Sequence, residues 1–217
     1  MATKNKTITK EEIISKYMDY VLEHEKEPKT VYKFCKQYEI PEADFYKFFA
    51  SIPSLKKGIW NTFFTNTLTL MQKNKDYATF GNRDKLLTFF YSFFELLTLN
   101  RSYVLFTLTQ GGNQLKNMEQ LKGLRKQLKE FTKELIEIGN AQKTSKITKH
   151  NPSIFSEGAW LQFLFLLKFW MNDESQGFEK TDLAIEKSVN TVFDLFDNTP
   201  LDNIVDFGKF LYKETFA

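Results

Sequence analysis

Apolar residues recur along this chain at spacings of three and four positions, which is the period of an amphipathic α-helix. The residues Thr9-Lys10-Glu11-Glu12 have the pattern of a capping box, in which a hydroxyl and a carboxylate each bond a backbone N–H group. They predict a helix over about residues 10–25. No stretch alternates every second residue, so we expect no β-strands. The apolar stripe of this first helix is Ile13, Ile14, Tyr17, Met18, Val21 and Leu22.

Two short helices and a longer one are predicted next. Thr30 is placed to cap the first short helix, and Pro41 suits the first turn of the second, where its missing N–H is harmless. Ser54 is expected to cap the longer helix, which joins the two halves of the molecule. The side chains expected to face inward from the two short helices are Val31, Phe34, Cys35, Tyr38, Phe45, Phe48 and Phe49.

The second half of the chain predicts a larger helical bundle. Helical stripes begin near Gly81 and are interrupted at Gly111-Gly112, and Pro152 is placed to open a helix after a polar loop at 143–151. That helix is apolar nearly all round from Trp160 to Trp170, so it must be covered on more than one side. Two amphipathic helices, at about 181–197 and 200–216, close the chain. The fold class is therefore all-α, with three short N-terminal helices and a larger bundle, about nine to ten helices in all.

The amino-acid composition predicts an interior filled by large aromatic side chains. The 217 residues include 23 Phe, 9 Tyr and 3 Trp, against only 9 Gly and 5 Pro, which favours long helices packed through aromatic rings. The formal net charge of +3, from 30 basic and 27 acidic residues, does not by itself demand a nucleic acid partner.

Several classes of chemistry lack their signatures in the sequence. The single cysteine, Cys35, excludes an intramolecular disulfide, and with only His24 and His150 the chain cannot build a zinc site from histidine and cysteine. No secretory signal is visible, and the most apolar window, residues 160–171, is too short to span a bilayer, so we expect a cytoplasmic protein. No phosphate-binding glycine loop, nucleophile elbow or metal-ligand spacing appears. We therefore expect a protein that is not an enzyme and needs no cofactor.

The stretch from Thr30 to Phe49 has the residue order of a helix-turn-helix. Thr30 and Val31 open the first helix, Ile40 follows the turn, and Phe45-Tyr46 with Phe49 form the core of the second helix. With the helices predicted around it, over residues 10–68, this stretch resembles the tetracycline-repressor-like (TetR) regulators. The resemblance implies a helix-turn-helix DNA-binding domain at residues 1–53. It implies a connecting helix with a ligand-binding and dimerisation domain at residues 54–217.

Four positions depart from the family pattern. Glu39 replaces the turn glycine, so a left-handed backbone there would be strained. Glu42 and Asp44 stand on the first turn of the recognition helix, where phosphates repel them, although a carboxylate can accept a hydrogen bond from cytosine N4. Ile52 stands near the position of a phosphate-contacting lysine in the family, and Lys56 and Lys57 are the candidates to replace that contact.

The resemblance also implies three sets of functional residues. The candidates for DNA contact are Thr30, Tyr32, Lys33, Ala43, Asp44, Tyr46, Lys47, Lys56 and Lys57. The candidates for lining a ligand pocket are Phe90, Phe94, Leu97, Tyr103, Phe106, Phe131 and Trp160. The candidates for a homodimer interface are Phe163, Leu167, Trp170, Ile185, Val189, Val192, Phe193 and Phe196.

Two functions are compatible with these residues. The first is a homodimeric transcriptional regulator that binds double-stranded DNA and senses a hydrophobic small molecule. The alternative is a protein of the same fold that has given up DNA and binds a lipid or isoprenoid. It would be similar to the mitochondrial protein of that fold that assists ubiquinone synthesis. In that case the amphipathic helix at 200–216 would lie on a membrane surface.

Overall fold

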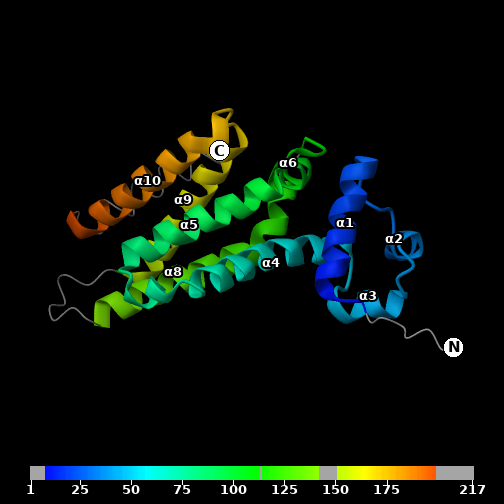
Figure 1. Ribbon diagram of the computed structural model, residues 1–217, viewed down its shortest axis with the longest axis horizontal. Helices are drawn as coiled ribbons and strands as arrows, with labels where there is room; N and C mark the ends of the chain where they lie inside the picture. The colour runs from blue at the N-terminus through cyan, green and yellow to red at the C-terminus, as the bar shows by residue number, and fades with distance from the viewer. Residues whose placement is uncertain (1–7, 113, 142–150, 199–217) are drawn as a thin grey trace. The chain divides into compact units, whose positions relative to one another are not determined.

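The computed structural model describes residues 8–112, 114–141 and 151–198. These residues form helices joined by turns and irregular segments, which confirms the predicted all-α fold class (Figure 1). No β-strand occurs within these ranges. The predicted closing helix at 200–216 and all but the last residue of the predicted polar loop at 143–151 lie outside them. The chain divides by its internal contacts into two compact units, Met1–Phe63 with Leu97–Leu124, and Phe64–Leu96 with Arg125–Ala217. The functional division at residue 53 stays a prediction.

The first unit contains the N-terminal helices and the segment around α6. The capping box is confirmed, because the Thr9 hydroxyl accepts from the Glu12 N–H at 3.1 Å and the Thr9 N–H donates to Glu12 Oε2 at 2.9 Å. Helix α1 packs against α6, and α2 packs against α3. The helices of this unit are α1 (Lys10–His24), α2 (Val31–Gln37), α3 (Glu42–Phe48), the start of α4 (Ile52–Gln72), α6 (Arg101–Thr109), α7 (Gln114–Met118) and the 3-10 turn η2 (Glu119–Leu121).

Helix α4 begins three residues earlier than the sequence predicts. Ser51, rather than Ser54, stands at its start, and the two serines exchange backbone-to-hydroxyl hydrogen bonds of 3.0 and 3.2 Å. The reason is that Pro53 is tolerated in the first turn of a helix, where its missing N–H leaves no bond unmade.

The second unit is built around α9 (Pro152–Met171). Asn151 caps this helix with Pro152 in its first turn, as predicted. Phe155 near its start meets Phe193 near the end of α10, with ring centroids 5.2 Å apart, so the two helices run antiparallel. The other elements of this unit are the rest of α4, η1 (Lys75–Thr79), most of α5 (Asn82–Leu99), most of α8 (Lys122–Ala141), η4 (Gln176–Phe178) and α10 (Glu179–Asn198).

Aromatic rings fill the interior of the second unit. Phe89 stacks on Phe93 with centroids 5.4 Å apart, and Phe93 meets Phe163 edge-on at 5.7 Å. Such pairs stabilise a core beyond the area they bury. The aromatic-rich composition is therefore used for packing between α5, α8 and α9.

The turn between α9 and α10 is fastened by Asp173, which is only 6% exposed. One carboxylate oxygen accepts from the N–H and hydroxyl of Ser175, and the other accepts from the N–H and hydroxyl of Thr181, at 2.7–2.9 Å. Burial raises the pKa of this carboxyl, but the four hydrogen bonds outweigh burial and lower its pKa to about 2. The ionised carboxylate thus holds the start of α10.

Candidate nucleic-acid interface

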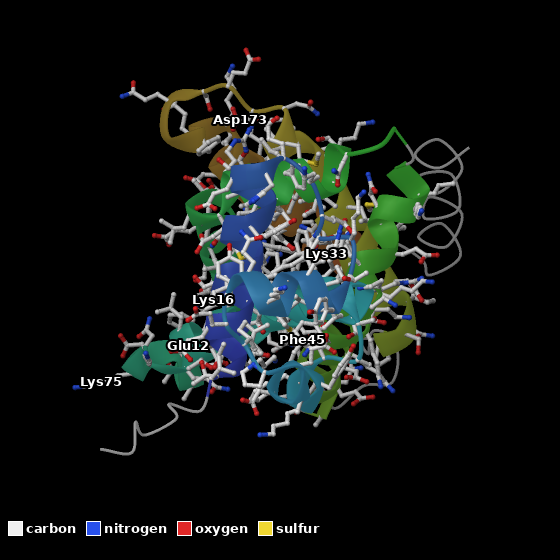
Figure 2. The ribbon with its side chains drawn as sticks, turned by 90° about the vertical axis from the view of Figure 1, so that its right-hand side faces the viewer. Glu12, Lys16, Lys33, Phe45, Lys75 and Asp173 are labelled. Atoms are coloured by element: carbon white, nitrogen blue, oxygen red, sulfur yellow. The ribbon has the colours of Figure 1, made fainter. Side chains whose placement is uncertain are left out.

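Helices α2 and α3 are held together from the inside by aromatic residues. Phe34 and Phe45 are fully buried, with ring centroids 6.2 Å apart, and Phe45 also lies 5.9 Å from Phe49. Figure 2 looks onto this pair of helices, with Lys33 labelled on α2 and Phe45 on α3. Phe48, predicted to face inward, is 41% exposed, because α3 ends there and the extended backbone at Phe49 carries the next ring into the core instead.

The turn between these helices has the left-handed backbone conformation that glycine favours, although the residue there is Glu39. Glu39 has φ +53°, in the left-handed region. The Ile40 N–H donates to the Cys35 carbonyl at 2.9 Å, and the Glu39 N–H donates to the Lys36 carbonyl at 3.4 Å. This is the hydrogen-bond pattern of a Schellman motif, closed by the buried side chains of Ile40 and Cys35. The left-handed backbone that glycine would favour is therefore present at Glu39, where the sequence indicated that it would be strained.

Most of the candidate DNA-contacting side chains point away from this core. Tyr32 is 60% exposed, Tyr46 is 51% exposed, and the Lys47 side chain is 59% exposed. Lys33 and Ala43 are also exposed, and the Thr30 hydroxyl accepts from the Lys33 N–H at 3.1 Å as the predicted helix cap. Two adjacent helices thus present tyrosine and lysine side chains to solvent.

Three of the candidate residues take part in ion pairs. Lys47 Nζ lies 2.6 Å from Asp44 Oδ1 on the same helix, so the positive charge of Lys47 compensates the negative charge of Asp44 within α3. Lys56 Nζ lies 2.5 Å from Glu27 Oε1, across 29 positions of sequence, while Lys57 is half-buried. The ion pair of Glu27 was not predicted from the sequence. Glu27 and Pro28 end the first helix, and nothing in this pattern indicates which lysine the carboxylate contacts.

Cys35 is 1% exposed on the inner face of α2. Burial, helped by the charge of Glu42, raises the pKa of its thiol to about 11. A neutral thiol in this position behaves as a small apolar side chain.

The candidate pocket residues fall into both units. Phe90, Phe94, Phe131 and Trp160 belong to the second unit, where Phe90 and Phe94 lie 6.5 Å apart and are buried in the aromatic core. Leu97, Tyr103 and Phe106 belong to the first unit. There Tyr103 meets Tyr17 of α1 edge-on at 6.4 Å, and burial, followed by the nearby Tyr17 and Glu27, raises the pKa of its phenol.

Most of the candidate dimer residues are covered by their own chain. Phe163, Leu167, Trp170, Ile185, Val189 and Phe193 are buried, Val192 is half-buried, and the side chain of Phe196 lies outside the described part of the chain. The same two helices expose other apolar side chains. Phe165 is 53% exposed and Phe169 is 36% exposed on α9, with ring centroids 6.1 Å apart, and Leu183 is 48% exposed on α10. We call these three residues the α9–α10 apolar face.

Within the described residues, no group of three or more His, Cys, Asp or Glu side chains is arranged to hold a metal ion. In the same ranges no helix combines the length and the apolar character that crossing a membrane requires.

Comparison with known proteins identifies a relationship over the second part of the chain. A family model described as tetracyclin repressor-like, C-terminal domain, matches residues 85–211, which is more than half of the sequence. A comparison with curated proteins found no match.

Proposed function

Because the chain belongs to the tetracycline-repressor-like family, we propose that it is a transcriptional regulator which binds duplex DNA through α2 and α3. The observation that carries this proposal is the division of those two helices into a buried aromatic side and an exposed side bearing Tyr32, Tyr46 and Lys47. A helix-turn-helix needs this arrangement, because its second helix must be anchored from behind while its outer side chains enter the major groove. We propose the cytoplasm as the place where this regulator acts, together with the DNA that it binds.

The acidic residues of α3 do not oppose this function. Asp44 is paired with Lys47 at 2.6 Å, so the two side chains together carry no net charge toward the phosphates. Glu42 is half-buried at the start of the helix, where a negative charge favours the helix dipole. The remaining charges on the outer face of α2, Lys33 and Lys36, are positive and exposed.

A second copy of the chain is the partner that fits the α9–α10 apolar face. A helix-turn-helix regulator reads two half-sites through two-fold symmetry, which requires a dimer. Only exposed side chains of α9 and α10 are accessible to a partner, so the proposed interface comprises Phe165, Phe169 and Leu183 together with the polar residues around them.

A hydrophobic small molecule is the effector that best suits the second unit. Phe90, Phe94, Phe131 and Trp160 come from three different helices, and the aromatic core around them holds few charged groups that could orient a sugar or a nucleotide. The lipid-binding alternative depended on the acidic recognition helix, on the absence of arginine from the N-terminal domain and on the amphipathic helix at 200–216. That last helix lies outside the described residues. No observation favours it over a regulator.

Salt-dependent binding tests the proposal directly. The purified full-length chain would be titrated into fluorescent duplexes, both random and taken from the region upstream of its own gene, at several salt concentrations. We expect the logarithm of the affinity to fall linearly with the logarithm of the salt concentration. Lys33→Gln should reduce the slope by about 0.9, because one phosphate contact is lost.

Lys75→Gln is the matched control, because it makes the same charge change at an exposed site in η1 of the second unit. This variant should leave the slope unchanged. Affinity that does not depend on salt, or equal effects of the two substitutions, would contradict DNA binding through α2 and α3.

Native mass spectrometry of the same preparation would detect a co-purified hydrophobic effector as an added mass.

A further inference from the structure

Two of the side chains on the outer side of α3 form an ion pair. Phe45 holds the helix from the inside, and the other six residues of α3, Asp44 and Lys47 among them, are exposed or partly exposed. We propose that the Asp44–Lys47 pair is a single reading unit for one C·G base pair in the major groove of the operator. This inference rests on the proposed DNA-binding function and names the base pair that the outer face of α3 recognises.

The geometry places an acceptor directly beside a donor. Asp44 and Lys47 are three positions apart and therefore neighbours on the helix surface. Lys47 Nζ lies 2.6 Å from Asp44 Oδ1, which leaves the second carboxylate oxygen and two ammonium N–H groups free for other partners. The Asp44 side chain is 22% exposed and the Lys47 side chain 59%, so both reach solvent on the same side of α3.

The major-groove edge of a C·G pair has the complementary pattern. Cytosine offers its N4 amino group as a donor, and guanine offers O6 and N7 as neighbouring acceptors. The carboxylate of Asp44 can accept from N4 while the ammonium of Lys47 donates to O6 and N7. An A·T pair fits less well, because its amino donor stands between two acceptors and the thymine O4 would face the carboxylate.

The pair is suited to specificity rather than to general affinity. A lone aspartate at this position would be repelled by the phosphates, and a lone lysine would bind phosphates of any sequence. Paired, the two groups cancel each other's charge. The unit therefore contributes little to the salt dependence of binding, and its contribution depends on the base pair that it meets.

Selection from a randomised duplex library would test this inference, with the full-length wild-type chain compared with variants. The wild-type chain should select a site with one C·G pair in each half-site that depends on residues 44 and 47. Asp44→Ala and Lys47→Ala should each lose about 5- to 100-fold of the preference at that position and keep the rest of the site. Asp44→Asn should shift the preference to A·T, because asparagine pairs with adenine N6 and N7.

Salt titrations of the same variants separate this inference from its alternatives. Asp44→Ala combined with Lys47→Ala should leave the salt slope unchanged. Lys33→Ala, as the matched control, should lower affinity for all duplexes equally and leave the C·G preference intact. Circular dichroism would verify that each variant is folded.

Two results would overturn the reading unit while leaving DNA binding standing. One is a selected site whose preferences are unaffected by Asp44→Ala and Asp44→Asn. The other is a Lys47→Ala variant whose salt slope falls by about 0.9 without a change in preference, since Lys47 then binds a phosphate. A wild-type chain that selects no site and shows no salt-dependent binding would instead refute the proposed function itself.

Discussion

The ammonium of Lys56 lies 2.5 Å from Oε1 of Glu27, and the lysine side chain is only 17% exposed. This lysine is one of the two candidates for a phosphate contact at the start of α4, yet its charge is already paired inside the first unit. We predict that Lys56→Gln lowers the free energy of unfolding by about 1 kcal/mol, because Glu27 loses its partner. The same variant should leave the salt slope of DNA binding unchanged.

Lys57→Gln is the matched comparison at the adjacent position. It should reduce the salt slope by about 0.9 and leave the unfolding free energy nearly unchanged. Denaturant unfolding and the salt titration would be measured on both variants. If Lys56→Gln reduced the slope as much as Lys57→Gln, the ion pair with Glu27 would have to open when DNA binds.

Glu39 is a non-glycine residue in a left-handed turn, at φ +53°. Relaxing this strain should stabilise the helix-turn-helix. We predict that Glu39→Gly is more stable than Glu39→Ala by about 1 kcal/mol in denaturant unfolding, because alanine keeps the steric conflict and glycine removes it. Both substitutions remove the same charge, so their difference isolates the backbone. Equal stability of the two variants would show that the turn does not need a left-handed residue in solution.

Asp173 accepts four hydrogen bonds at the start of α10, and its pKa is about 2, below the usual value of 3.8. Because the pKa is lowered in the folded protein, the carboxylate stabilises the fold above about pH 4. That contribution is lost as the pH falls through 2. We predict that Asp173→Asn is less stable than the wild type by about 1–3 kcal/mol at pH 7, since the amide group cannot accept all four bonds.

The pH dependence of the stability difference between Asp173→Asn and the wild type tests the role of the lowered pKa more directly than its size at pH 7. Unfolding by denaturant at a series of pH values should show the gap between Asp173→Asn and the wild type shrinking between pH 4 and pH 2. Asp76→Asn, the same chemical change at an exposed residue of η1, should show no comparable gap. A gap for Asp173→Asn that stays constant over this range would mean that the lowered pKa does not contribute to stability.

Cys35 combines 1% exposure with a thiol pKa raised to about 11. At pH 8 very little of the thiol is ionised, and only the thiolate is a nucleophile. We predict that a water-soluble thiol reagent labels the folded protein at least about 100-fold more slowly than the protein unfolded in urea. Rapid labelling under native conditions would show that α2 opens readily and that the thiol is accessible to oxidants.

Short-range patterns predicted the helices well, because their signals lie in neighbouring residues. The capping box at Thr9 and the proline at the start of α9 are both local arrangements, and both are confirmed. The start of α4 was displaced by three residues because Ser51 and Ser54 are equally able to cap and Pro53 fits either frame. The resemblance supplied the position of a missing glycine at Glu39, but the sequence did not decide whether the turn there is left-handed.

Contacts between residues that are far apart in the sequence could not be predicted from the sequence. Glu27 and Lys56 are 29 positions apart, and the chain offers several other lysines of the same kind. The apolar helix at 160–171 shows the same limit for burial. Phe163 and Phe165 are identical residues two positions apart, yet one is fully buried and the other 53% exposed. Only the placement of α5 and α10 decides which side of such a helix is covered.

The α9–α10 apolar face leads to the last prediction. Phe165 and Phe169 are exposed at successive turns of α9, and a proposed second copy of the chain covers them. We predict that the wild type sediments as a dimer and that Phe165→Glu with Phe169→Glu converts it to a monomer, because the interface would bury two unpaired charges. The monomer should also bind an operator more weakly, since two half-sites are no longer read together.

Leu70→Glu is the matched control for this experiment. Leu70 is 54% exposed on α4, so the same kind of apolar-to-acidic change is made on a helix other than α9 and α10. This variant should remain a dimer with unchanged DNA affinity. Analytical ultracentrifugation and a thermal melt of each variant distinguish dissociation from unfolding. A wild type that is monomeric, or a double variant that stays dimeric and folded, would rule out this face as the interface, because a charged pair of glutamates cannot be buried there without a partner.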